Sequence, residues 1–176
     1  MTFRRILEKL RIIFVFYKII IYVVLYMTYS IVKQEDIKFG KKQEKNVFPK
    51  LKNFFSDGLK QTDETKGMFC RWDYEDSDKK IFVELKSRRI SFSKYKTTFL
   101  DVNKLVPAKR YLDKNPNGEW WFCFNFTDGL YYVNYYDIEY LKGTAKPTRI
   151  SRGDVVCNIT IPIHLLGEVE EGFCLE

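Results

Sequence analysis

The sequence predicts an α/β domain with a mixed β-sheet flanked by helices, and an N-terminal hydrophobic helix ahead of it. Three observations predict this architecture. The chain of 176 residues suffices for one domain, and its hydrophobic fraction of 45% and charged fraction of 30% are ordinary for globular proteins. Segments with strand periodicity alternate with segments of helical periodicity. An apolar run precedes them at residues 12–32.

The apolar run at residues 12–32 contains a single charge, Lys18. As a helix it would rise about 30 Å, which is enough to cross a bilayer. Its N-terminal flank has cations that suit a cytoplasmic N-terminus: Arg4, Arg5, Lys9 and Arg11. A core helix, or a start assigned too early with Met27 as the first residue, are the alternatives. We therefore divide the chain into a hydrophobic leader (residues 1–33), a membrane span or a mis-assigned start, and a main domain (residues 34–176).

The main domain begins with a predicted helix over residues 41–56. Its apolar side chains recur at helical spacing on one face: Val47, Leu51, Phe54 and Phe55. A β-hairpin follows, with strands at residues 68–74 and 80–87 and a turn at residues 76–78.

The second half of the chain predicts a helix and three further strands. The helix covers residues 97–112, with Thr97 or Thr98 as its N-cap. The strands, read from their alternation, lie at residues 119–126, 130–136 and 155–163. The Asp128-Gly129 pair predicts a hairpin between the first two of them.

Composition excludes several kinds of site. The single histidine, His164, excludes zinc sites built on several histidines. The four cysteines form no C-x-x-C pair, which indicates reduced thiols in an intracellular protein: Cys70, Cys123, Cys157 and Cys174. The net charge of +7 favours a polyanionic partner.

One group of residues has the composition of a metal-dependent hydrolytic site. Glu84 and Lys86 share a face of the strand at residues 80–87, because strand side chains alternate with period two. Asp73 lies on the preceding strand, from which it can approach Glu84. Converging carboxylates suit Mg²⁺ or Mn²⁺, and a neighbouring lysine can orient or deprotonate an attacking water. Glu44, on the first helix, could contact such an ion through water.

The specificity of this group depends on how often the Glu-x-Lys pattern occurs and on where it lies. Glu-x-Lys occurs twice in the chain, about as often as chance predicts, and only Glu84-Leu85-Lys86 lies in an apolar strand pattern with an acid in the preceding strand. The alternative is a solvated cross-strand charge pair on an exposed face of the sheet.

The spacing of Asp73, ten residues, then Glu84-Leu85-Lys86 resembles the core motif of the PD-(D/E)XK nuclease superfamily, although Trp72 stands where that motif has proline. The wider sequence is similar to nuclease-like proteins of large DNA viruses and bacteriophages over roughly residues 37–136. The segments that resemble them are Gly40 to Glu44, Trp72 to Tyr74, Val83 to Arg88, Tyr95 to Thr98, and Asn103 to Leu105.

This resemblance implies a restriction-endonuclease-like core and the hydrolysis of nucleic-acid phosphodiester bonds with Mg²⁺ or a similar ion. It implies that Glu44, Asp73 and Glu84 are the acidic, metal-binding residues of the site and that Lys86 is the catalytic lysine.

A basic segment follows the motif. Residues 86–110 contain eight cations and one anion, Asp101, so this segment alone accounts for a charge of +7. Such a segment beside a metal site suits the phosphate backbone of DNA. The residues that we expect to contact nucleic acid are Arg88, Arg89, Lys94, Tyr95, Lys96 and Lys104. An ordinary solvated face is the alternative.

The sequence therefore favours a viral, intracellular, metal-dependent deoxyribonuclease. One alternative is a catalytically inactive nucleic-acid-binding or virion-associated module with the same fold, possibly tethered to a membrane through residues 12–32. A weaker alternative is a membrane protein whose main domain binds anionic lipid.

Overall fold

The computed structural model describes residues 3–62, 66, 70–151 and 154–170. The backbone divides into two compact units, Met1–Lys42 and Gln43–Glu176, whose boundary lies beyond the expected division after residue 33. Helix α1 (Phe3–Phe55) contains all the described residues of the first unit and continues into the second.

The hydrophobic leader is helical, as the apolar run predicts. Large apolar side chains at several of its described positions are about half exposed: Val15, Phe16, Ile19, Ile20, Val24 and Met27. Of the residues that the structure describes, none belong to a helix with both the length and the apolar character needed to cross a membrane. For some residues of the expected span at residues 12–32, the side chains lie outside the part of the structure that is described.

The second unit is built on a six-stranded mixed sheet, which confirms the predicted α/β class with a mixed sheet. Its strand order is β1-β2-β3-β5-β6-β9. β3 and β5 are parallel, and every other neighbouring pair is antiparallel. The strands are β1 (Lys60–Gln61), β2 (Tyr74–Asp76), β3 (Ile81–Ser87), β5 (Glu119–Asn125), β6 (Leu130–Asn134) and β9 (Gly167–Glu168).

A second, three-stranded antiparallel sheet has the order β4-β8-β7. Its strands are β4 (Thr97–Asp101), β7 (Lys146–Ser151) and β8 (Asp154–Pro162). Helix α3 (Val102–Leu112) follows β4 and leads back to β5, so it forms part of the crossover between the parallel strands β3 and β5. The short helices are α4 (Tyr135–Ile138), η1 (Phe92–Lys94), η2 (Glu139–Thr144) and η3 (Ile163–Leu165).

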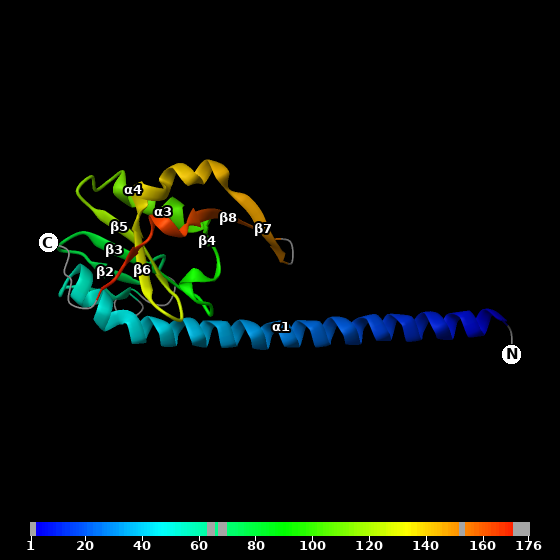
Figure 1. The fold of residues 1–176 in the computed structure, drawn as a ribbon. Coiled ribbons are helices and arrows are strands. Elements are labelled where there is room, and N and C mark those ends of the chain that lie inside the picture. The colour runs from blue at the N-terminus through cyan, green and yellow to red at the C-terminus, as the bar shows by residue number, and fades with distance from the viewer. Residues whose placement is uncertain (1–2, 63–65, 67–69, 152–153, 171–176) are drawn as a thin grey trace. The chain divides into compact units, whose positions relative to one another are not determined.

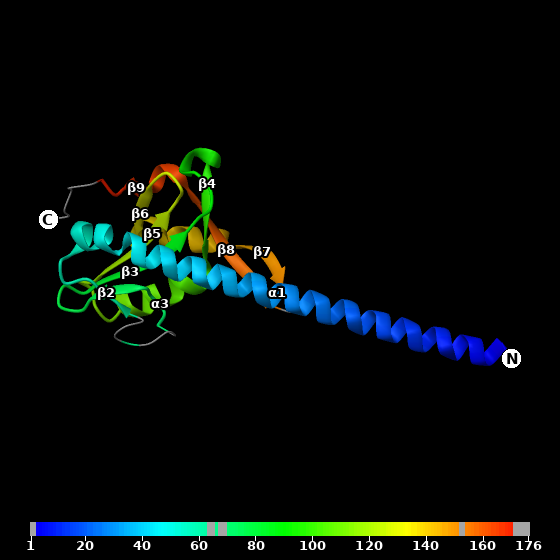
Figure 2. The ribbon, with the colours of Figure 1, turned by 90° about the horizontal axis from the view of Figure 1, so that it is seen from below.

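Two hydrophobic cores lie on opposite faces of the large sheet. The last turns of α1, drawn in cyan in Figures 1 and 2, cover one face, where Leu51 packs with Val83 and Leu85. Helix α3 covers the other face, where Leu105 packs with Phe82. The alternation predicted for the second hairpin strand is thereby confirmed, and it directs Glu84 toward the α3 side.

The end of α1 is fixed to the β2–β3 turn by a buried hydrogen bond. The Ser56 hydroxyl donates to Asp76 Oδ2 at 2.5 Å. Gly58 lies so close that a Cβ at this position would be 2.5 Å from the same carboxylate oxygen. A side chain larger than hydrogen at position 58 would therefore displace the Asp76 carboxylate from this position.

Two predicted elements need correction. Residues 97–101 form strand β4 and not the start of a helix, because Thr98 and Leu100 alternate with exposed Phe99 and pair with β8. The N-cap of α3 is Asp101, whose carboxylate accepts from the Asn103 N–H at 2.8 Å, and not Thr97 or Thr98.

The first hairpin strand also differs from its prediction. It begins at Tyr74, later than the predicted strand over residues 68–74, of which residues 68 and 69 lie outside the described part of the chain. The predicted hairpins themselves are confirmed, as β2–β3 and β5–β6.

We expect Leu51→Ala to lower the free energy of unfolding by about 2–5 kcal/mol, because Leu51 is fully buried between α1 and the sheet. Urea denaturation followed by circular dichroism measures this. Lys45→Ala, at an exposed position of the same helix, is the control and should change stability by less than about 0.5 kcal/mol. Equal effects of the two substitutions would contradict the packing of α1 on the sheet.

Candidate active site

Strand β2 separates from β3 at Asp73, and the Asp73 side chain takes over the pairing. The Asp73 N–H still donates to the Val83 carbonyl at 3.0 Å. The next donor along β3, the Leu85 N–H, is bonded at 2.7 Å to Asp73 Oδ2 in place of a backbone carbonyl. This hydrogen bond fixes the Asp73 carboxylate at the edge of β3, beside Glu84.

Glu84 is a buried carboxylate, only 1% exposed, with two lysine partners. Its Oε1 accepts from Lys86 Nζ at 2.5 Å and from Lys104 Nζ at 2.8 Å. Lys86 comes from the same strand and Lys104 from α3. The paired ammonium groups compensate a charge that would otherwise be very costly to bury. Within the described part of the chain, Glu84 Oε2 has no hydrogen-bond partner.

The protonation of Asp73 depends on its burial and on the charges around it. Burial raises the pKa of its carboxyl group, the nearby charge of Glu84 raises it further, and the net result is a pKa of about 7. The Leu85 N–H and Lys86 act in the opposite direction, but they do not outweigh the first two causes. A metal cation placed between Asp73 and Glu84 would favour the ionised form of Asp73.

Lys86 is held in its protonated form. Burial alone would lower the pKa of its ammonium group, but the ion pair with Glu84 outweighs burial and raises the pKa above its ordinary value. A protonated lysine donates hydrogen bonds and cannot accept a proton. Of the two roles expected for Lys86, orienting a water is the one that a protonated ammonium group can fill directly.

Glu44 lies near enough for its charge to raise the pKa of Asp73. Its backbone is held there by the Tyr74 hydroxyl, which donates to the Glu44 carbonyl at 2.7 Å, and by Phe48, whose ring stacks on that of Tyr74. In the described part of the chain, no three His, Cys, Asp or Glu side chains are grouped closely enough to hold a metal ion. Glu44 is thus not grouped with Asp73 and Glu84 as a third direct ligand, and its expected contact with an ion through water stays a prediction.

The donor set nevertheless fits a hard divalent cation. Asp73 and Glu84 provide two adjacent carboxylates, and Mg²⁺ usually binds through one or two carboxylates together with waters and substrate phosphate. The unpartnered Glu84 Oε2 is a buried oxygen that such an ion would satisfy.

The residues expected to bind nucleic acid differ in how exposed their side chains are. Arg88 is tied to the protein, because its guanidinium donates to the Phe99 carbonyl at 2.5 Å and lies over the Phe124 ring, and burial lowers its pKa. The other four outside α3 are exposed: Arg89, Lys94, Tyr95 and Lys96. Lys94 lies over the ring of Tyr95, with its Nζ 5.6 Å from the centroid.

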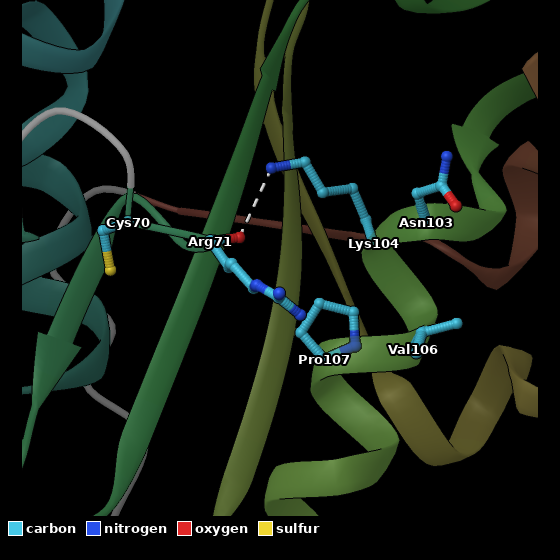
Figure 3. A pocket seen from close by; sticks show the side chains of 6 residues that line it. All are labelled: Cys70, Arg71, Asn103, Lys104, Val106 and Pro107. Carbon is cyan, nitrogen blue, oxygen red and sulfur yellow. Dashed lines mark hydrogen bonds between the residues drawn. The ribbon is translucent and has the colours of Figure 1, made fainter. Parts of the chain in front are cut away.

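The structure also has a pocket that the sequence did not predict. It has a volume of about 390 Å³ and is lined by Cys70, Arg71, Asn103, Lys104, Val106 and Pro107. Figure 3 shows Lys104 reaching across it to the Arg71 carbonyl, at 3.3 Å. No sequence pattern joins residues 70–71 to the first turn of α3, so only the folded chain identifies this pocket.

Comparison of the chain with protein-family models, with curated proteins and with solved structures found no match.

Because its folded-state pKa of about 7 exceeds the ordinary value of 3.8, Asp73 binds a proton more tightly in the folded chain. Its contribution to stability is present below about pH 4 and is lost as the pH rises through 7. We therefore expect Asp73→Asn to be more stable than the parent by about 2–4 kcal/mol at pH 8 and nearly equal to it at pH 4.

Chemical denaturation in EDTA across this pH range measures the difference. Asp137→Asn, which changes an exposed aspartate on α4, is the control and should follow the parent at every pH. The same pH dependence in the parent and in Asp73→Asn would show that the Asp73 carboxyl is not destabilised by burial.

Proposed function

We propose that this protein is a divalent-metal-dependent nuclease that hydrolyses phosphodiester bonds of DNA on a restriction-endonuclease-like core. The observation that carries the proposal is the meeting of Asp73, Glu84 and Lys86 at the edge of β3. Glu84 and Lys86 come from β3 and Asp73 directly precedes β2, in the order and spacing of the nuclease motif that the sequence resembles.

Asp73 and Glu84 would hold Mg²⁺ or Mn²⁺, with Glu44 reaching it through water. When bound, the ion would lower the pKa of a water and stabilise the charge that develops on the phosphate oxygens. Asp73 Oδ2 is engaged by the Leu85 N–H, which leaves Oδ1 as the oxygen directed to the ion.

Lys86 and Lys104 supply the remaining positive charge. Both ammonium groups contact Glu84 Oε1, so both lie within a few ångströms of the proposed ion site. Lys86, which stays protonated, would donate a hydrogen bond to the attacking water or to a phosphate oxygen. Lys104, whose ammonium group has three donors, would contact the substrate phosphate as well as Glu84.

The charge distribution supports a nucleic-acid substrate. The exposed cations Arg89, Lys94 and Lys96 follow β3 in the chain, and the net charge of the protein is +7. Long-range attraction of this kind favours a polyanion, and it weakens as salt rises.

We expect Glu84→Gln and Lys86→Ala each to reduce DNA cleavage in Mg²⁺ or Mn²⁺ by about 100-fold or more, because each removes a group placed at the reacting phosphate. Cleavage of labelled single-stranded and duplex DNA measures this, and circular dichroism verifies that the variants are folded. Glu119→Gln, at an exposed carboxylate on β5, is the matched control.

Two outcomes would overturn the assignment. Full activity of both variants would exclude these catalytic roles. DNA binding in EDTA without any cleavage by the parent in either metal would indicate a non-catalytic binding module.

Binding of the ion can be tested without activity. At pH 8, we expect added MgCl₂ to raise the melting temperature of the parent by about 2–5 °C relative to EDTA, because only the folded chain brings the two carboxylates together. The melting temperature of Asp73→Asn should not respond. Equal shifts in the parent and the variant would place the ion elsewhere.

A further inference from the structure

The pocket at the start of α3 adjoins the proposed active site through one side chain. Lys104 lines the pocket, and its Nζ lies 2.8 Å from Glu84 Oε1 and 3.3 Å from the Arg71 carbonyl. Arg71 is two residues from Asp73. A ligand in the pocket would therefore contact the same lysine that contacts Glu84.

The lining of the pocket is chemically mixed (Figure 3). Arg71 and Lys104 are cations, Asn103 has an amide that both donates and accepts, and Val106 and Pro107 are apolar. In the described part of the chain, no hydrogen bond or ion pair engages the Arg71 guanidinium or the Asn103 amide. Cations suit a phosphate, an amide suits the edge of a base, and an apolar wall suits the face of a sugar or base.

The size of the pocket distinguishes between ligands. Its volume of about 390 Å³ lies in the lower part of the range of small-molecule sites. A nucleotide, with about twenty non-hydrogen atoms, is of the size that such sites accept, whereas a lone phosphate would leave most of the pocket to water.

We propose that this pocket receives one unpaired nucleotide of the substrate strand, adjacent to the phosphate that is cut. The inference rests on the proposed nuclease function and names its substrate class as DNA with unpaired nucleotides. Lys104 and Arg71 hold the phosphate of that nucleotide, and Asn103, Val106 and Pro107 contact its base or sugar.

Base pairing opposes this binding mode. A base inside a duplex reaches a pocket only when it is unstacked and unpaired, which costs a few kcal/mol. A single strand has no pairing to break, so it binds more tightly than a duplex of the same length, although the duplex carries about twice the charge.

The test uses the full chain, a labelled oligothymidylate and a blunt duplex of equal length. Fluorescence anisotropy in EDTA measures binding, and gel analysis in Mg²⁺ measures cleavage. We expect the parent to bind the single strand about tenfold more tightly than the duplex. Val106→Phe, which fills the pocket, and Asn103→Ala, at an exposed position, should weaken single-strand binding about five- to tenfold and leave duplex binding unchanged.

Lys142→Ala on η2 is the control for a general loss of affinity and should bind both DNAs as the parent does. Equal affinity of the parent for both DNAs, or normal single-strand binding by both pocket variants, would overturn the inference. Thymidine monophosphate that binds the parent as tightly as the oligothymidylate would also overturn it, since a free nucleotide would then be the ligand.

The two proposals fail separately. Cleavage that does not prefer single strands and does not change in the pocket variants would retain the nuclease and remove the unpaired-nucleotide pocket. Pocket-dependent binding of single strands without any cleavage would retain the pocket and remove the nuclease.

Discussion

The buried charge of Glu84 is the constraint on which the arrangement of the site depends. A carboxylate that is 1% exposed needs cationic partners, and it obtains them from two directions: Lys86 on its own strand and Lys104 on α3. The second of these contacts connects the helix to the strand across one core of the protein. The position of α3, and with it the pocket at its first turn, is therefore coupled to the charge balance at Glu84.

The same charge balance explains why the pKa values of the neighbouring Asp73 and Lys86 are shifted from their ordinary values. Asp73 carries no full compensation of its own, so burial and Glu84 raise its pKa, whereas Lys86 benefits from Glu84 and remains protonated. Shifted pKa values in adjacent groups are common at catalytic sites, because such sites confine charge in partly dry surroundings. Below about pH 7, protonation of Asp73 and the ion pairs of Glu84 together reduce the negative charge of the site.

Local patterns predicted the positions of Glu84, Lys86 and Asp73, because these residues lie on or directly beside the two strands of one hairpin. Alternation along residues 80–87 placed Glu84 and Lys86 on one face, and the hairpin brought Asp73 near them. The contact of Lys104 with Glu84 depends on how α3 crosses the sheet, which no local pattern specifies. The error at residues 97–101 has the same origin: the partner of that strand, β8, lies about sixty residues further along the chain, and threonines at that point also resemble a helix cap.

The hydrogen bond between the Leu85 N–H and Asp73 Oδ2 has a consequence for recognition of a cation. A carboxylate on an open strand samples several rotamers, and a ligand must select one of them at an entropic cost. Here the main chain of β3 has already immobilised the side chain through one oxygen, and the second oxygen is left with a defined direction. The Asp73 side chain is thus preorganised, so that a cation binding there would have little side-chain freedom left to remove.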